Sequence, residues 1–224
     1  MARRTKTEAA ITREQLLDAA ERVFRERGVS RTSLAEVAAA AGVTRGAVYW
    51  HFRDKADLFG AMCQRATLPL ETMLETTGCA AQEDPLLALR ALAIVALSRL
   101  ATDPRSQAVF EVIFQSELTD EMAPIAARRQ TERLECLSHV ERVIEHAVAL
   151  GQLPADTDAA LATHALHAFI AGVMREWVHD PHAFDLASVA PALIDMMIAG
   201  LVVNPPRRAG TGCPLAHPHA QVAS

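Results

Sequence analysis

The sequence predicts an all-α protein in which an N-terminal three-helix head of the helix-turn-helix type joins a larger C-terminal helical body, with about nine helices in all. Half of the 224 residues are hydrophobic and 22% are charged, and alanine and leucine outnumber the valine, isoleucine and aromatic residues that favour sheet. Helix-capping residues recur along the chain, each followed by apolar positions of helical period. The length exceeds that of a typical single domain, so we expect two domains.

Charge is divided unevenly along the chain. Residues 1–60 carry 11 Lys or Arg against 8 Asp or Glu, a net charge of +3, whereas the remaining residues carry 11 against 19, a net charge of −8. A basic N-terminal part on an acidic body is typical of a protein in which one end meets nucleic-acid phosphate and the rest stays away from it.

The first helix of the head is expected after a flexible basic arm at residues 1–9. Thr12 and Gln15 have the spacing of a capping box, and an apolar stripe follows them. We therefore expect the helix to begin at Thr12 and to end at Gly28. The head as a whole is expected to span residues 10–70.

Three further capping signals divide the rest of the head. Ser33 and Glu36 form a second box, which opens a short helix that stops at Gly42. Thr44 caps another short helix that runs through about residue 51. Asp54 caps a longer one, which the pattern extends towards or beyond Pro69.

The body is expected at residues 71–203. An Asp followed by Pro, at 84–85 and again at 103–104, provides an N-cap and a first helical residue. The expected helices run from 85 to 100, from 104 through at least 114, from 120 to 150 before Gly151, from 158 to 179, and from 188 to 201 with Pro191 near its start. The tail at residues 204–224 is rich in Pro, Gly and small residues and is predicted to be disordered.

Residues 34–53 have the pattern of a helix-turn-helix. Gly42 supplies a left-handed turn, and apolar Val43 and Val48 fix the angle between the two short helices. Arg45 and Tyr49 are four residues apart, so they share the face opposite Val48 and point outward. Such a helix enters the major groove of DNA, where Arg45 suits the O6 and N7 atoms of guanine.

Other residues of the head are expected to hold phosphates. Hydroxyls and amides at the starts of the two short helices suit phosphate. Tyr49, His51 and Lys55 are also expected to contact phosphates, and Arg3, Arg4 and Lys6 are expected to act as a mobile arm. The predicted DNA-contacting residues are Thr32, Ser33, Thr44, Arg45, Gly46, Tyr49, His51 and Lys55. The alternative interpretation is two ordinary capped helices with a solvated arginine and a core-facing aromatic cluster.

The run TSLAEVAAAAGVTRGAVYWHFRDKADLF, at residues 32–59, closely resembles the signature of the TetR family of bacterial repressors. The segments RRTK, GQLPADTD, FIAGVMREWV and HDPHAFDL extend the resemblance to AcrR-like repressors of multidrug efflux genes. This resemblance implies a homodimer built on the last two helices, a palindromic double-stranded operator, and release by varied apolar compounds. Residues 111–118 read EVIFQSEL and lack the His, Lys and Cys common in that subgroup.

The body is predicted to supply an effector pocket and a dimer interface. Candidate pocket residues lie on helices that must face inward, although a core residue has the same pattern: Phe110, Phe114, Cys136, Val140, His167, Ile170 and Trp177. Candidate interface residues are small or apolar: Ala168, Ala171, Gly172, Met174, Leu193, Met196, Met197 and Leu201.

Cysteine usage and the N-terminus favour a cytoplasmic protein. The four cysteines, Cys63, Cys79, Cys136 and Cys213, have no paired spacing, so a reducing compartment is expected. The basic N-terminus lacks the apolar stretch of a signal peptide, and no run of about 18 uncharged apolar residues predicts a membrane span.

Other classes of function are less well supported by the sequence. Cys213 with two tail histidines lacks the spacing of a zinc site, and no nucleophile–base group or phosphate loop is evident, so we predict no metal, no cofactor and no enzymatic activity. Two alternatives stay open. One is a DNA-binding regulator that responds to a protein partner or to oxidation at Cys63 or Cys136. The other is a helical enzyme or carrier in which the helix-turn-helix is incidental.

Overall fold

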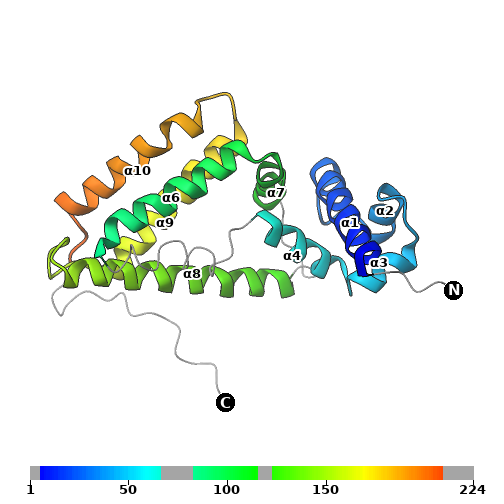
Figure 1. Ribbon diagram of the computed structural model, residues 1–224, viewed down its shortest axis with the longest axis horizontal. Helices are drawn as coiled ribbons and strands as arrows, with labels where there is room; N and C mark the ends of the chain where they lie inside the picture. The colour runs from blue at the N-terminus through cyan, green and yellow to red at the C-terminus, as the bar shows by residue number, and fades with distance from the viewer. Residues whose placement is uncertain (1–5, 67–82, 116–122, 209–224) are drawn as a thin grey trace, which may run out of the picture.

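The computed structural model describes residues 6–66, 83–115 and 123–208, and these residues form an elongated, all-helical molecule (Figure 1). The head lies at one end and the body at the other, which confirms the predicted fold class. The described helices are α1 (Lys6–Arg27), α2 (Leu34–Ala40), α3 (Arg45–His51), α4 (Lys55–Ala66), α6 (Pro85–Thr102), α7 (Pro104–Gln115), α8 (Ala123–Ala149), α9 (Ala159–His179) and α10 (Leu186–Val203).

The capping signals set the helix ends of the head as predicted. Ser33 and Glu36 form a complete capping box at the start of α2, and the Thr44 hydroxyl accepts the Ala47 amide at the start of α3. The Asp57 amide donates to Asp54 Oδ1 at 2.7 Å where α4 begins. The predicted extension of α4 past residue 66 and the domain boundary near residue 70 lie outside the described residues.

The expected start of the first helix was wrong. Helix α1 begins at Lys6, and Thr12 lies inside it, with its hydroxyl donating to the Glu8 carbonyl at 2.9 Å. A threonine hydroxyl that bonds to the carbonyl four residues back does not cap, because the helix continues on both sides of it. Residues 6–9 are therefore helical rather than a flexible arm, and Arg3 and Arg4 lie outside the described residues.

In the body, the long helix α8 runs beneath α6, α9 and α10 (Figure 1). Asp84 caps α6 as predicted, Asp158 caps α9 at the expected start of that helix, and Gly151 takes a φ of +76° after α8. Helix α10 starts two residues earlier than expected, because Asp185 rather than a later residue accepts the Ser188 amide. Pro191 consequently lies in the second turn of α10 instead of the first.

The first residues of the predicted disordered tail are ordered. Residues 204–208 lie against the loop before α9, where the Asp158 amide donates to the Pro206 carbonyl at 2.8 Å and the Arg208 amide donates to the Asp156 carbonyl at 2.8 Å. Arg207 also pairs with the Asp156 carboxylate. These contacts correct the prediction for residues 204–208, while residues 209–224 lie outside the described part.

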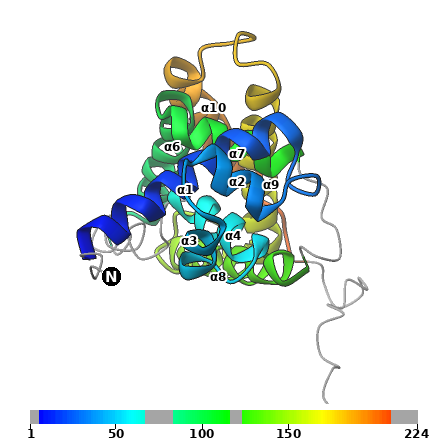
Figure 2. The same cartoon turned by 90° about the vertical axis from the view of Figure 1, so that its right-hand side faces the viewer.

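Helix α7 belongs to the body in sequence but shares the core of the head. Val109 and Val112 are buried among apolar side chains of α1 and α4. Phe110, on another face of the same helix, packs against the cluster formed by α6, α9 and α10. Viewed from the head end, α1 and α2 lie in front of α7 (Figure 2). Helix α7 thus connects the two parts of the molecule through its two faces.

Two helices of the body, α6 and α10, have the length and hydropathy of a membrane span, although α6 contains two arginines and α10 contains one aspartate. The core helix of a helical bundle passes the same test. Helix α6 packs against α8 and α10, and an Arg90–Asp195 ion pair joins it to α10. Helix α10 is the less buried of the two, so an apolar face of it remains uncovered in the single chain.

Candidate nucleic-acid interface and surfaces of the body

The turn between α2 and α3 is held by buried contacts. Val37 and Val48 are fully buried and Ala38 is 2% exposed. Gly42 has a φ of +68°, and the Val43 amide donates to the Ala38 carbonyl at 3.0 Å. A side chain with a Cβ is disfavoured at this φ, so Gly42 is suited to the turn. The packing holds α3 at one angle to α2, as the sequence predicted.

Helix α1 holds α2 at both ends. The Arg22 guanidinium donates to the Ala40 carbonyl at 2.9 Å, next to the C-terminus of α2. Arg27 pairs with Glu36 in the first turn of α2 at 3.0 Å. Because these contacts come from one helix, α1, α2 and α3 present a fixed outer surface.

Arg45 and Tyr49 share an exposed face of α3, as predicted, but this face lies beside the buried Val48 rather than opposite it, because residues three positions apart are neighbours on a helix. Both side chains are exposed, and Arg45 Nη2 donates to Tyr49 Oη at 3.4 Å. The Arg45 guanidinium carbon lies 5.6 Å from the centroid of the Tyr49 ring. Gly46, which is also exposed, adds no side chain between this face and an approaching surface. The face therefore presents a cation, a phenol and accessible backbone.

Ser33 and Thr44 are exposed at the starts of α2 and α3. The Ser33 hydroxyl donates to Glu36 Oε2 at 2.8 Å and accepts the Glu36 amide at 3.3 Å, so it is engaged in its own helix. The Thr44 hydroxyl accepts the Ala47 amide at 3.3 Å, and its proton can still be donated. The structure places both residues at the surface, and their contact with phosphate stays a prediction.

Two of the predicted DNA contacts need correction, because their side chains are turned inward. Thr32 is 2% exposed, and its hydroxyl donates to the Gly28 carbonyl at 2.8 Å. Lys55 is 7% exposed, and its Nζ donates to the Ser30 carbonyl at 3.2 Å. In this conformation both residues tie the loop after α1 in place, and neither side chain is available to a phosphate.

The sequence reasoning missed Trp50, which is 72% exposed at the end of α3. Its ring stands edge-on to the half-buried His51 ring, with centroids 4.6 Å apart. On a helical projection Trp50 lies close to the direction opposite the buried Val48. The argument that selected Tyr49 could therefore have found Trp50 as well. An exposed indole on this face adds an apolar surface that suits the methyl group of thymine.

In the body, six of the seven candidate pocket residues are half-buried. The Phe110 and Phe114 rings lie 5.8 Å apart, and the Arg175 guanidinium of α9 lies 5.9 Å from the Phe114 ring centroid. Ile170 and Phe110 both pack against the buried cluster of α6, α9 and α10. The seventh, Trp177, is buried in that cluster, and its indole N–H donates to the Phe184 carbonyl at 3.2 Å.

The three candidates Cys136, Val140 and His167 lie on α8 and α9, which pack against each other. Burial raises the pKa of the Cys136 thiol. Burial also lowers the pKa of His167, and the nearby charges of Arg133 and His164 lower it further. Half-buried apolar and weakly polar side chains of this kind are typical of the residues that line pockets for apolar molecules.

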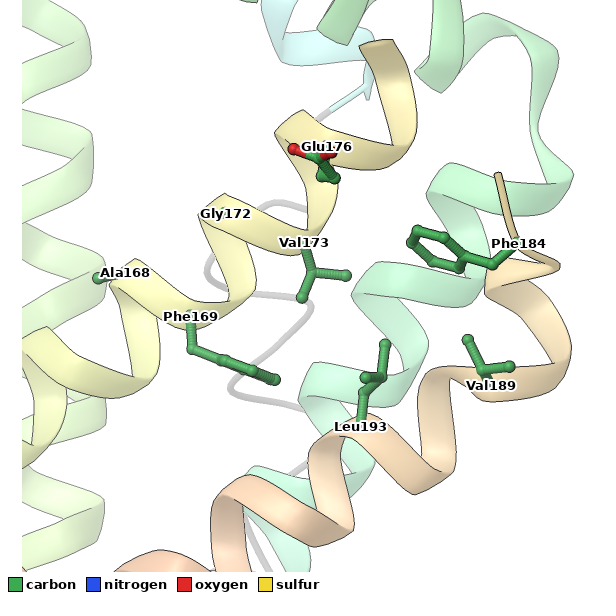
Figure 3. A pocket seen from close by; sticks show the side chains of 8 residues that line it. All are labelled: Ala168, Phe169, Gly172, Val173, Glu176, Phe184, Val189 and Leu193. Carbon is green, nitrogen blue, oxygen red and sulfur yellow. The ribbon is translucent and has the colours of Figure 1, made fainter. Parts of the chain in front are cut away.

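An apolar groove runs between α9 and α10 on the outside of the body (Figure 3). Its lining includes three of the predicted interface residues, Ala168, Gly172 and Leu193, together with the Phe169 and Phe184 rings. Met196 lies on α10 and is 61% exposed. One predicted interface residue was wrong: Leu201 is 4% exposed and packs in the core with α6 and α8.

The head and the body each match a family of known proteins. Residues 16–62 match the profile of bacterial regulatory proteins of the tetR family. Residues 84–203 match the C-terminal region of MAATS-type transcriptional repressors. The chain belongs to the TetR family.

Several members of the TetR family resemble this chain over almost its whole length. The transcriptional regulator TtgR of Pseudomonas putida is 37% identical over 209 residues, which are 93% of this chain and 100% of TtgR. NalD, the secondary repressor of the MexAB-OprM multidrug efflux pump in Pseudomonas aeruginosa, is 35% identical, with a TM-score of 0.80 over 87% of this chain and 98% of NalD.

SmeT, the repressor of the Stenotrophomonas maltophilia multidrug efflux pump SmeDEF, has been solved with triclosan. That structure is 33% identical to this chain, with a TM-score of 0.73 over 89% of this chain and 99% of SmeT. The TetR match at residues 16–62 covers most of the head, and the MAATS-type match covers α6 to α10. The chain is therefore a TetR-family repressor related to multidrug efflux regulators, and its family is one of transcriptional regulators rather than enzymes.

Proposed function

We propose that this protein is a ligand-responsive repressor that binds a palindromic operator as a homodimer, is released by a small apolar effector and controls a multidrug efflux operon. The observation that carries the proposal is the exposed Arg45–Tyr49 face on a helix that buried contacts hold in place. The relatives that repress efflux pumps support the regulated operon. A protein that acts on the chromosome in this way works in the cytoplasm.

On the operator, α3 enters the major groove. Arg45 donates to guanine O6 and N7, and Gly46 lets the backbone approach the bases. Tyr49, Trp50 and His51 meet the sugar–phosphate edge and thymine methyl groups. The amides at the starts of α2 and α3, beside Ser33 and Thr44, hold phosphates and fix the register.

The homodimer forms through the α9–α10 groove. Isologous interfaces of this kind bury one apolar patch of each subunit against its copy. The small residues Ala168 and Gly172 permit close approach, and Leu193 and Met196 supply apolar area. Two recognition helices held about one helical turn of DNA apart then meet two half-sites of a palindrome.

The effector binds next to the half-buried side chains of α7, α8 and α9. The proposed contacts are Phe110, Phe114, Cys136, Val140, His167 and Ile170, with Trp177 as a wall of the adjacent core. Triclosan in SmeT is a small molecule bound to a related repressor. An effector that prefers the body in a conformation with mismatched heads weakens operator binding tenfold for about every 1.4 kcal/mol of that preference.

The thiols give less support to an oxidation sensor. Cys63 is 5% exposed within the core of the head. Burial raises the pKa of Cys136, which disfavours the reactive thiolate form. A small-molecule effector is thus the better-supported of the two regulators.

The test is a titration of the full-length protein with a duplex selected from a random pool, with and without triclosan and a graded series of apolar compounds. We expect specific binding by the dimer and a weakening of at least about tenfold by one or more compounds. Phe114→Ala should reduce that response without changing the affinity of the free protein for DNA. Specific binding that no compound alters would contradict the proposed release by a small molecule. Equal binding to every duplex would contradict the proposed recognition of an operator.

A further inference from the structure

Arg65, near the C-terminus of α4, lies among three carboxylates of α1. Its guanidinium is 3.2 Å from Glu14, 2.6 Å from Asp18 and 2.8 Å from Glu21. The three acids are spaced four and three residues apart, so they lie on one face of α1. The Arg65 side chain is only 10% exposed, and burial raises the pKa of Glu21 despite the opposing effect of Arg65. Partial exclusion of water strengthens such pairs relative to those at the surface.

Arg65 and Asp18 also contact two helices, α6 and α7, that connect the head to the body. The Arg99 guanidinium of α6 donates to the Arg65 carbonyl at 3.2 Å. The Arg105 guanidinium of α7 lies 3.5 Å from Asp18 Oδ1, the carboxylate that Arg65 also binds. Four helices, α1, α4, α6 and α7, therefore meet at this cluster of charges.

Helix α7 is joined to the head along its length and not only at this point. Val109 and Val112 are buried in the core of the head. Further along, Glu111 lies 3.8 Å from Arg25 of α1. The aromatic residues Phe110 and Phe114 of α7 lie towards α9, where Phe114 meets Arg175. One face of α7 is thus fastened to the DNA-binding head while another meets the body.

We infer that Arg65 is a positioning residue that fastens the head to α7, so that α1–α4 and α7 turn as one rigid unit against α8, α9 and α10. Arg65 itself is too buried to touch DNA. It acts through Asp18 and the α7 contacts, which set the angle at which α3 is presented. The inference rests on the proposed function in its last step, in which an effector at Phe110 and Phe114 displaces α7 and carries the recognition helix with it.

Three variants, Arg65→Gln, Arg65→Lys and Asp18→Asn, and a control variant test the rigid unit in the free, full-length protein. Arg65→Gln removes the positive charge that pairs with all three acids. Asp18→Asn is milder, because it weakens the link between Arg65 and Arg105 while Glu14 and Glu21 keep their pairs. Arg90→Gln removes an arginine that is 36% exposed, against 10% for Arg65, and whose ion pair with Asp195 joins α6 to α10 within the body. Thermal melts establish that each variant is folded.

The first readout is hydrogen–deuterium exchange of the backbone amides of α7, which needs neither DNA nor effector. We expect exchange near Val109 and Val112 to be about tenfold faster in Arg65→Gln and also faster in Asp18→Asn, with Arg90→Gln unchanged and Arg65→Lys between the extremes. Faster exchange confined to α1 and α4 would overturn the inference, because Arg65 would then stabilise the head alone. Equal acceleration by Arg90→Gln would overturn it as well.

The second readout is affinity for the selected operator over a series of salt concentrations. Arg65→Gln should weaken binding about tenfold with an unchanged salt slope, because no phosphate contact is lost. A reduced slope would mean that Arg65 contacts DNA and would overturn the inference. Absence of specific binding by the unaltered protein would count against the proposed function, whereas the exchange of α7 would still decide whether the rigid unit exists.

Discussion

The head and the body of this repressor are built in different ways. In the head, the starts of α2 and α3 are fixed by capping residues within three positions of the groups they bind, and the core side chains are covered within the single chain. In the body, an apolar groove along α9 and α10 is left open, and the half-buried Phe110 and Phe114 rings of α7 lie towards α9. The core of the head is covered within one copy, whereas the body leaves apolar surface that the proposed dimer and effector would cover.

This difference predicts where single substitutions act. A change in the core of the head should act on folding, and a change on the outer face of the body should act on assembly. Each experiment below compares one region with the other.

The largest effect is expected for Phe59→Ala in the core of the head. The Phe59 side chain is fully buried and its ring stands edge-on to Phe24, with centroids 6.1 Å apart. Removing a buried phenyl group should lower the free energy of unfolding by about 3–5 kcal/mol. Chemical denaturation monitored by circular dichroism measures this loss. If Phe59→Ala reduced dimer formation and left the free energy of unfolding unchanged, the head core would act on assembly rather than on folding, contrary to this prediction.

Met196→Asp should leave folding intact and break the dimer. Met196 is 61% exposed on α10, so an aspartate there is solvated in the monomer but buried in the proposed interface. The dimer should lose roughly 2 kcal/mol or more, about thirtyfold in dissociation constant. Sedimentation equilibrium checks the change. Val95→Asp on α6, which replaces an apolar side chain that is 49% exposed, is the matched control. An equal loss for both variants would place the interface elsewhere.

Ser33→Ala removes one cap from the head. The capping box at the start of α2 loses the hydroxyl that accepts the Glu36 amide at 3.3 Å. The expected loss in unfolding free energy is about 1 kcal/mol. Ser33→Asp, which restores an acceptor, should recover most of it in the same denaturation assay. A loss that Ser33→Asp does not recover would point to another role for the hydroxyl.

Acid should weaken the helix caps of both regions. Hydrogen bonds from Ser188 hold the pKa of Asp185 below its ordinary value, and those from Ser33 do the same for Glu36. A carboxylate with a lowered pKa in the folded state stabilises it above the ordinary pKa of about 4 and loses that contribution as the pH falls below it. Asp185→Asn should therefore flatten the acid limb of a melting-temperature profile. A steeper fall of the melting temperature with acid in Asp185→Asn would contradict the stabilising role of the Asp185 carboxylate.

The local signals of the head could be predicted from the sequence to the residue. Ser33, Thr44 and Gly42 act on backbone groups a few positions away, so their spacing carries the information. Trp50 was within reach of the same reasoning. The start of α1 was not, because the Thr12 hydroxyl had two partners available and the helix continued through it.

Contacts between distant segments could not be predicted from spacing. Lys55 is buried because its ammonium group meets the carbonyl of Ser30, which lies 25 positions earlier. The burial of Leu201, the ordering of residues 204–208 and the double role of α7 arise in the same way. The helices of the body could therefore be predicted from the sequence, whereas only some of the residues on its surfaces could be.

The central claim is that α3 reads DNA through Arg45, and the most direct measurement compares Arg45→Ala with the unaltered protein on the selected operator and on a scrambled duplex. Loss of the Arg45 base contact should cost about 1–3 kcal/mol on the operator, roughly fivefold to 150-fold, with little change on the scrambled duplex. Arg207→Ala, which removes an exposed arginine from the body, should alter neither. Unchanged operator affinity for Arg45→Ala, or an equal loss on both duplexes, would contradict the account.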